Sequence, residues 1–265
     1  MGIRGRGAKS ILLLIAIGLT AGLMSGLFGV GGGTVIVPLL TIFARFEHRL
    51  AAGTSLAAIV PIATVGVISY AVHGAVAWIP ALILAAAAVV GAQIGTSLLA
   101  RMSVTVLRWI FVAFLVVVIV GLFFIIPSRD AQLELTLLST LGLIVTGLVT
   151  GTLSGLLGVG GGVIIVPALM LGFGASDLIA KGTSLMMMIP TALSGTAGNL
   201  RRGNVDILAA VLIGVSACAT TALGATISEL IDPVAGNILF AVFVVFIAAQ
   251  MAVKAWGGGR AARGQ

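Results

Sequence analysis

The sequence is poor in charged residues. Only 8% of its 265 residues are Asp, Glu, Lys or Arg, whereas 60% are hydrophobic. A soluble globular protein carries roughly 25% charged residues. A chain this apolar has too little polar surface to cover a water-facing exterior, so the composition argues against a soluble fold and for the lipid bilayer as surroundings.

Residues that build catalytic and metal sites are scarce as well. Cys218 is the single cysteine, so a disulfide within the chain is excluded. His48 and His73 are too few and too far apart to suggest a metal site, and the sequence offers neither a nucleophile–base set nor a His-Glu-x-x-His motif. We therefore expect no enzyme, no metal and no cofactor.

Eight stretches carry no charged residue, and they predict the fold class. A spanning helix needs about 20 apolar residues, and continuous apolar runs without period-two alternation favour helices over a barrel. Six stretches fit one crossing each, and the first and fifth are too long for one. The sequence therefore predicts an all-α polytopic membrane protein with eight full spans. The stretches are 10–44, 50–72, 74–100, 109–128, 135–176, 182–200, 207–228 and 233–253.

The chain contains an internal repeat at an offset of 129 residues. Residues 18–38 read GLTAGLMSGLFGVGGGTVIVP and residues 147–167 read GLVTGTLSGLLGVGGGVIIVP, with 14 of 21 positions identical. A Gly-Thr-Ser-Leu sequence at 53–56 recurs at 182–185 in the same register. Composition bias would not hold one register over this length, so we divide the chain into a first repeat, 1–128, and a second, 129–265.

Each repeat begins with a long glycine-rich segment and continues with three ordinary spans. In one model the long segment crosses the bilayer once. In the other it turns at the glycines and returns as a short limb, near 33–43 and 162–173, a tilted or re-entrant half-helix. The remaining spans are expected near 51–72, 77–99, 108–126, 181–200, 207–228 and 234–254.

The distribution of Lys and Arg favours the hairpin model. These residues concentrate on the cytoplasmic side of membrane proteins. The single-crossing model divides the 14 Lys and Arg residues nine against five, whereas the hairpin model leaves only Arg129 and Lys181 opposite the other twelve. We therefore expect inverted repeats, both termini in the cytoplasm, and an outer side that holds the acidic Asp177 and Glu229.

The Gly-Val-Gly-Gly-Gly sequences at 29–33 and 158–162 are the first candidate site. Consecutive glycines unwind a helix and expose backbone N–H groups, and each following half-helix offers the positive end of its dipole. No Lys or Arg lies inside a predicted span, so such backbone donors are the expected anion ligands. The fourth-residue spacing of Gly18, Gly22 and Gly26, and of their repeats, instead predicts close helix packing.

Hydroxyl side chains are the second candidates. The Thr-Ser pairs of both Gly-Thr-Ser sequences are expected at helix starts, where they either bind substrate or cap the helix. Asn199 and Gln93 are expected to form hydrogen bonds between helices. Prolines are expected to kink the helices at Pro38, Pro61, Pro167 and Pro190. The expected substrate-binding residues are Gly29, Gly31, Gly32, Gly33, Thr54, Ser55, Gly158, Gly160, Gly161, Gly162, Thr183 and Ser184.

The duplicated motif, with Gly-Thr-Ser-Leu after each copy, resembles the sulfite exporter TauE/SafE family over essentially the whole chain. The resemblance implies a bacterial inner-membrane permease for sulfite or small organosulfonates. We expect a secondary transporter that works by alternating access, with no buried carboxylate in a span to carry protons. An anion channel and an accessory subunit of a larger complex are the alternatives. The expected partners are a small anion and the bilayer, not nucleic acid, and a homodimer stays open.

Overall fold

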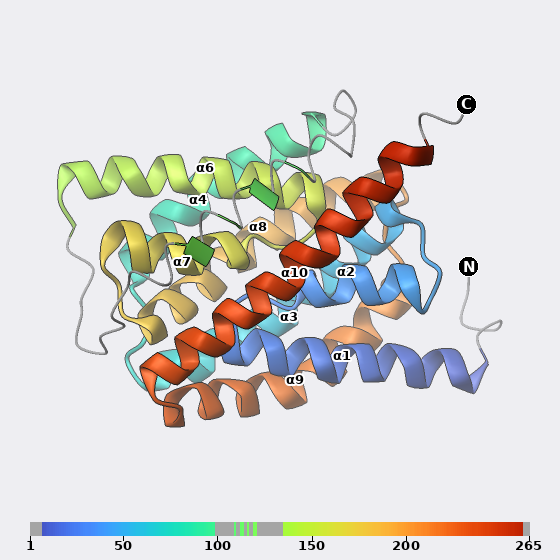
Figure 1. The fold of residues 1–265 in the computed structure, drawn as a ribbon, viewed down its shortest axis with the longest axis horizontal. Coiled ribbons are helices and arrows are strands. Elements are labelled where there is room, and N and C mark those ends of the chain that lie inside the picture. The colour runs from blue at the N-terminus through green and yellow to red at the C-terminus, as the bar shows by residue number, and fades with distance from the viewer. Residues whose placement is uncertain are drawn as a thin grey trace.

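The protein is a bundle of helices. The computed structural model describes residues 7–98, 109, 112–113, 116, 119–120 and 135–261. The expected span near 108–126 lies outside the described residues, apart from a few isolated positions. The helices are α1 (Ala8–Phe28), α2 (Gly33–Ile42), α3 (His48–Val72), α4 (Trp78–Leu98), α6 (Leu137–Leu157), α7 (Gly162–Phe173), α8 (Asp177–Arg201), α9 (Ile207–Leu230) and α10 (Pro233–Ala261) (Figure 1).

Six of the helices in the described part are long and apolar enough to cross a membrane. They are α1, α3, α4, α6, α9 and α10. Helix α8 has 25 residues but does not reach this apolarity, because Ser, Thr, Gly and Asn interrupt its apolar residues. Large apolar side chains also face outward, as the exposed Leu12, Val215 and Phe246 show. The protein is therefore a polytopic membrane protein with six candidate spans among the described residues, and the expected number of eight stays a prediction.

Each repeat begins with a helical hairpin. Helix α1 runs away from the end of the bundle that holds the N-terminus, and the shorter α2 returns toward it (Figure 1). Leu14 of α1 and Leu40 of α2 accordingly share one buried cluster. In the second repeat a Cβ on Gly142 of α6 would lie 3.1 Å from the ring of Phe173, at the end of α7. The hairpin model therefore agrees with the structure, and α1 and α6 run in opposite directions.

The first helix of each repeat packs against a helix of the other repeat. Helix α1 packs along α9 of the second repeat, and α6 packs along α4 of the first. Glycines make these contacts close, because a Cβ on Gly22 would overlap the Ala217 carbonyl oxygen and one on Gly151 would overlap that of Ala88. Both pairs are related by the 129-residue offset. The packing role predicted for the fourth-residue glycines is confirmed at these positions.

This packing between the repeats produces two helix groups that do not coincide with the two repeats. The first group is α1, α2, α3 and α9, and the second is α4, α6, α7 and α8. The first has an apolar cluster of its own, which includes Ile17, Ile36 and Ile213. Helices α3 and α8 pack against each other between the groups. Helices α3 and α8 thus form the main contact between the two groups.

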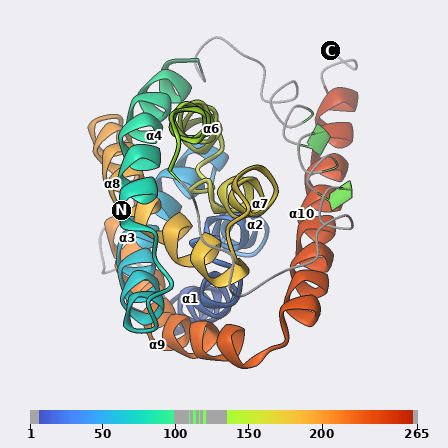
Figure 2. The same cartoon turned by 90° about the vertical axis from the view of Figure 1, so that its left-hand side faces the viewer.

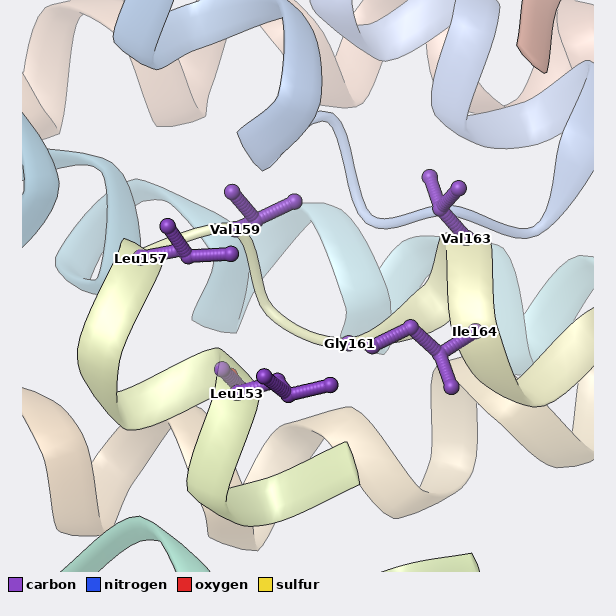
Figure 3. Close-up of a pocket in the computed structure, with 7 residues that line it drawn as sticks. Leu153, Leu157, Val159, Gly161, Val163 and Ile164 are labelled. Carbon is purple, nitrogen blue, oxygen red and sulfur yellow. The ribbon is translucent and has the colours of Figure 1, made fainter. Parts of the chain in front are cut away.

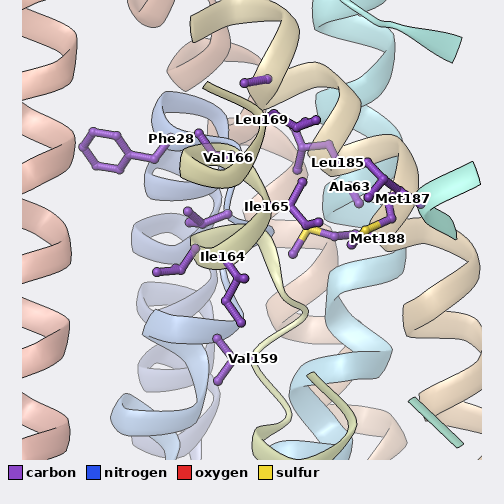
Figure 4. Packing of buried hydrophobic residues seen from close by; sticks show 14 of the residues in the cluster. Phe28, Ala63, Val159, Ile164, Ile165, Val166, Leu169, Leu185, Met187 and Met188 are labelled. Atoms are coloured by element: carbon purple, nitrogen blue, oxygen red, sulfur yellow. The ribbon is translucent and has the colours of Figure 1, made fainter. Parts of the chain in front are cut away.

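Helix α10 stands along one side of both groups (Figure 2). Its inner face reaches the bundle through aromatic side chains, since the Phe28 ring stacks on Phe243 at 4.8 Å between centroids and lies 5.6 Å from Phe240. Figure 4 shows Phe28 extending from α1 to this contact, away from the central methionines. This phenylalanine is the last residue of α1, so α10 abuts the glycine break that follows it.

Candidate functional site

Glycine conformation breaks the first long segment of each repeat. Gly29 ends α1 with a φ of 67°, and Gly32 precedes α2 with a φ of 76°. Gly158 and Gly161 do the same around α6 and α7, with φ values of 69° and 86°. Such left-handed angles cost little for glycine and strain other residues. The repeated motif thus encodes two identical turns, as expected.

The two breaks lie directly against each other. A Cβ on Gly33 would come within 2.5 Å of the Val159 carbonyl oxygen, and one on Gly162 within 2.5 Å of the Val30 Cα. Figure 3 shows the second break passing from Leu157 through Val159 and Gly161 to Val163, beside the first. The last glycine of each motif is therefore required by contact with the other motif.

The breaks leave buried backbone donors without a partner. All ten residues of the two motifs are buried. Within the described chain, hydrogen bonds are found from the N–H groups of Gly29 and Gly158 to the helices before them, but none from those of the three consecutive glycines that follow in each motif. An unpaired buried N–H costs about 1–3 kcal/mol. Six such donors at one place indicate a site for an acceptor. They belong to Gly31, Gly32, Gly33, Gly160, Gly161 and Gly162.

Buried hydroxyls add to this site, and most of them were not predicted. Within the described residues, five buried serine and threonine hydroxyls lack a hydrogen-bond partner in and around the breaks: Ser25, Thr34, Ser55, Thr150 and Ser154. Ser25 and Ser154 are equivalent, each four residues before the first glycine of its motif. The serine repeated in both motifs was the sequence signal that could have identified them. Only Ser55 was among the expected site residues.

Two apolar side chains close the space between the breaks. Ile59 of α3 and Met188 of α8 occupy equivalent positions, and both lie beside Gly31 and Gly160. The Met188 Cε would be 2.6 Å from a Cβ on Gly31 and 2.8 Å from one on Gly160. Figure 4 shows Met188 at this central position. These two side chains therefore close the space between the breaks in this conformation, and the pocket lined by Ser154, Val159 and Gly161 in the second break holds no space for a water molecule.

The threonines of the Gly-Thr-Ser sequences join the repeats to each other. Thr54 Oγ1 accepts a hydrogen bond from the Asp206 N–H at 3.0 Å, and Thr183 Oγ1 accepts one from the Ala77 N–H at 3.0 Å. The predicted position at helix starts is wrong, because α3 begins at His48 and α8 at Asp177. The capping interpretation therefore fails, and substrate binding by these two threonines stays a prediction.

The other predicted polar residues have mixed outcomes. Ser184 Oγ donates to the Gly29 carbonyl at 3.0 Å, which ties α8 to the first break. Gln93 Nε2 donates to Ser194 Oγ at 2.8 Å, so the bond expected between helices is confirmed. Asn199 Nδ2 instead donates to the Gly195 carbonyl of its own helix, so that expectation is wrong. The four prolines lie inside helices, and their kinks stay a prediction.

The structure corrects the expectation that no charge is buried among the helices. Asp177 and Lys181, expected outside the spans, are both 4% exposed in the first turns of α8. Lys181 Nζ lies 3.2 Å from Asp177 Oδ2 and donates to Ser228 Oγ at 2.8 Å. The expectation that charged residues mark exposed ends of spans failed here, because a charged residue near a helix end can still be covered by neighbouring helices. A buried carboxylate and a buried ammonium are therefore both present.

The groups at the two breaks can donate hydrogen bonds. Its free donors are backbone N–H groups and hydroxyls, and two half-helices begin there with the positive ends of their dipoles. These are ligands for an anion rather than for a metal, and no group of three metal-ligating residues occurs among the residues described.

Comparison with known proteins assigns the family. The model of the family described as "Sulfite exporter TauE/SafE" matches residues 2–122 and 143–265. The chain belongs to this family. The two matched segments coincide with the internal repeat, and the family is one of membrane transporters. The TauE/SafE resemblance predicted from the duplicated motif is thereby confirmed.

Individual relatives have the same general name. The "Probable membrane transporter protein YdhB" of Bacillus subtilis is 28% identical over 228 residues, which cover 84% of this chain and 92% of that protein. A "Probable membrane transporter protein" of Xylella fastidiosa is 29% identical over 251 residues, 90% of this chain and 95% of its own length. No solved structure matches. These names support a transporter and leave its substrate open.

Proposed function

We propose that this TauE/SafE protein is a secondary transporter that moves sulfite or a small organosulfonate across the bacterial inner membrane. The substrate binds between the two glycine breaks, where Gly31, Gly160 and the glycines beside them lie close together. The main support for this site is the set of six N–H groups without partners in the buried glycine motifs, together with the unpaired Ser25 and Ser154 hydroxyls. A sulfur oxyanion offers several acceptor oxygens to such donors.

The division into two helix groups supports a mechanism of alternating access. The group α1, α2, α3 and α9 supplies the first break, and the group α4, α6, α7 and α8 supplies the second. Rocking at the α3–α8 contact would separate the breaks first on one side and then on the other. Ile59 and Met188 come from these two contacting helices, so the same motion would withdraw them from between the glycines.

The distribution of charge supports a cytoplasmic location for both termini. Arg45 and Arg202 lie in the connections that flank α2 and α8 at the end where α1 begins, whereas Glu229 and Asp232 lie at the opposite end of α9 (Figure 1). Positive charge faces the cytoplasm. In a Cys218→Ser background, an impermeant maleimide applied to intact cells should label Leu137→Cys and not Arg202→Cys. The reverse labelling would overturn this orientation.

The membrane potential supplies a driving force for export. An anion that leaves a negative interior gains about 2.3 kcal/mol per charge for each 100 mV. Export of a monovalent sulfur oxyanion therefore needs no ATP site. In this conformation the side chains between the breaks prevent a continuous pore. The membrane potential bears only on the direction of transport, since the donors at the breaks can bind an anion from either side.

The test is flux through the purified protein in liposomes. Labelled sulfite, an organosulfonate and sulfate should be compared side by side, with protein-free liposomes as the control. Saturable flux of sulfite or the organosulfonate, with counterflow, would support the carrier. Flux that does not saturate and shows no counterflow would identify an anion channel instead. A folded protein that moves none of the three would contradict the proposal and favour an accessory role.

A further inference from the structure

A buried polar cluster lies at one end of the bundle, beside the first glycine break. The Lys181 ammonium contacts Asp177 Oδ2 and Ser228 Oγ. The neighbouring Tyr70 hydroxyl donates to the Gly26 carbonyl at 2.6 Å. At the edge of the cluster His73 Nδ1 lies 2.7 Å from Glu229 Oε1. The cluster thus joins α3, α8 and α9 at the place where α1 ends.

The cluster breaks the symmetry between the repeats. The residue equivalent to Lys181 in the first repeat is Ala52, and the residue equivalent to Asp177 is His48. The contact itself is symmetric, because a Cβ on Gly29 would lie 2.6 Å from the Lys181 Cα and one on Gly158 would lie 2.6 Å from the Ala52 Cα. The second repeat therefore has a buried cation, Lys181, at a position where the first repeat has Ala52.

The Asp177 carboxylate is only partly satisfied where it lies. Its Oδ2 faces Lys181, but its Oδ1 is buried without a hydrogen-bond partner. An ionised carboxylate has about four acceptor positions, so burial of half of it unpaired is costly. Asp177 is also the first residue of α8 and follows the exposed Gly174 closely in sequence. Asp177 therefore lies at the very start of α8, close to an exposed part of the chain.

We propose that Lys181, with Ser228, is a second oxyanion subsite on the transport path, and that Asp177 occupies it in the closed state as an internal substitute for the substrate. The inference rests on the proposed function, which it extends with a charged station at one side of the first break. An arriving sulfite takes the place of the carboxylate beside Lys181. When the anion leaves, Asp177 returns and closes that side.

Opposite effects of the two charged residues test this proposal. Sulfite affinity should be measured by calorimetry in detergent, and sulfite flux in liposomes. Asp177→Asn removes the competing charge and should lower the Kd for sulfite about tenfold, whereas Lys181→Met should raise it by about the same factor. A purely structural ion pair would instead make both variants bind sulfite more weakly or leave the affinity unchanged, and either result would overturn the proposal.

Two further variants keep the test sharp. Glu229→Gln removes the same charge from the same end but keeps the Asp177 and Ser228 contacts of Lys181, so its Kd for sulfite should change less than about threefold. Equal tightening in Glu229→Gln and Asp177→Asn would show a general charge effect and overturn the proposal. If Lys181→Met does not fold because Asp177 is left alone, Asp177→Asn combined with Lys181→Met removes both charges and should bind as weakly as Lys181→Met is expected to.

The wild-type protein separates this inference from the proposed function. If wild type carries sulfite but the Asp177 and Lys181 variants do not move in opposite directions, the subsite is wrong and the transporter stands. If folded wild type neither binds nor carries sulfite or the organosulfonate, the proposed substrate class fails, and the subsite fails with it.

Discussion

Ile59 and Met188 are equivalent residues of the two repeats, and together they fill the space between Gly31 and Gly160. Both side chains are fully buried. They lie on the contact between α3 and α8, where the two helix groups meet. The closed centre of the protein thus depends on two apolar side chains rather than on a salt bridge or a loop.

Shortening the central methionine should open the site. Met188→Ala is expected to leave a cavity between the glycine breaks, at a cost of about 2–5 kcal/mol in stability. Flux of the transported anion should then include a component that does not saturate. Liposome flux over a range of concentrations measures this, with the half-buried Met186→Ala as the control. Saturable flux identical to wild type would show that Met188 does not close the path.

The glycines between α1 and α9 should be intolerant of even one methyl group. A Cβ at Gly22 would overlap the Ala217 carbonyl oxygen, so Gly22→Ala must push the helices apart, which we expect to cost about 1–3 kcal/mol. Gly151→Ala should behave alike at the α4–α6 contact. Thermal unfolding in detergent measures both.

The control for these glycines is Gly198→Ala in α8. Nothing lies within 4 Å of a Cβ at this position. Alanine should therefore stabilise the helix by up to about 1 kcal/mol. A loss of stability at Gly198 equal to that at Gly22 would mean that helix propensity, and not packing, sets the result.

The cross-repeat threonines should matter for stability. Thr54→Val and Thr183→Val each leave a backbone N–H, of Asp206 or Ala77, without its acceptor. We expect a loss of about 1–2 kcal/mol for each. Thr64→Val is a matched control, because Thr64 donates only to the Val60 carbonyl of its own helix. If Thr54→Val and Thr183→Val unfold at temperatures as high as Thr64→Val does, the hydrogen bonds between the repeats do not stabilise the fold.

The paired serines should show the opposite behaviour. Ser25→Ala and Ser154→Ala each remove a buried hydroxyl that has no partner, so stability should stay within about 1 kcal/mol of wild type or rise. If these hydroxyls bind substrate, the KM for transported anion should rise about fivefold or more. Parallel measurements of melting temperature and transport kinetics separate the two roles. Lower stability with unchanged KM would make the serines structural.

Much of the fold could be predicted, because the glycine pattern and the charge pattern agree. The short limbs expected near 33–43 and 162–173 are Gly33–Ile42 and Gly162–Phe173 in the structure. Left-handed glycines end one helix and begin the next, so the motif itself sets these boundaries. The count of Lys and Arg then distinguished a returning limb from a crossing one.

The packing of α1 on α9 and of α6 on α4 could not be predicted in this way. The repeated glycines identify a packing face on α1 and α6, but the two repeats offer nearly the same partner surfaces. Ala88 and Ala217 are equivalent, and either could in principle receive Gly22. The burial of Lys181 could not be predicted for another reason. The pattern of charges locates the ends of helices, but it does not show which neighbouring helices cover those ends.

The pairing of α1 with α9 fixes the order in which this protein can be completed. Helix α1 is synthesised well before α9, which carries the surface that receives Gly18, Gly22 and Gly26. Until then the glycine face of α1 is left to lipid or to a helper protein. A nascent chain that stops before α9 therefore leaves the glycine face of α1 without its partner helix.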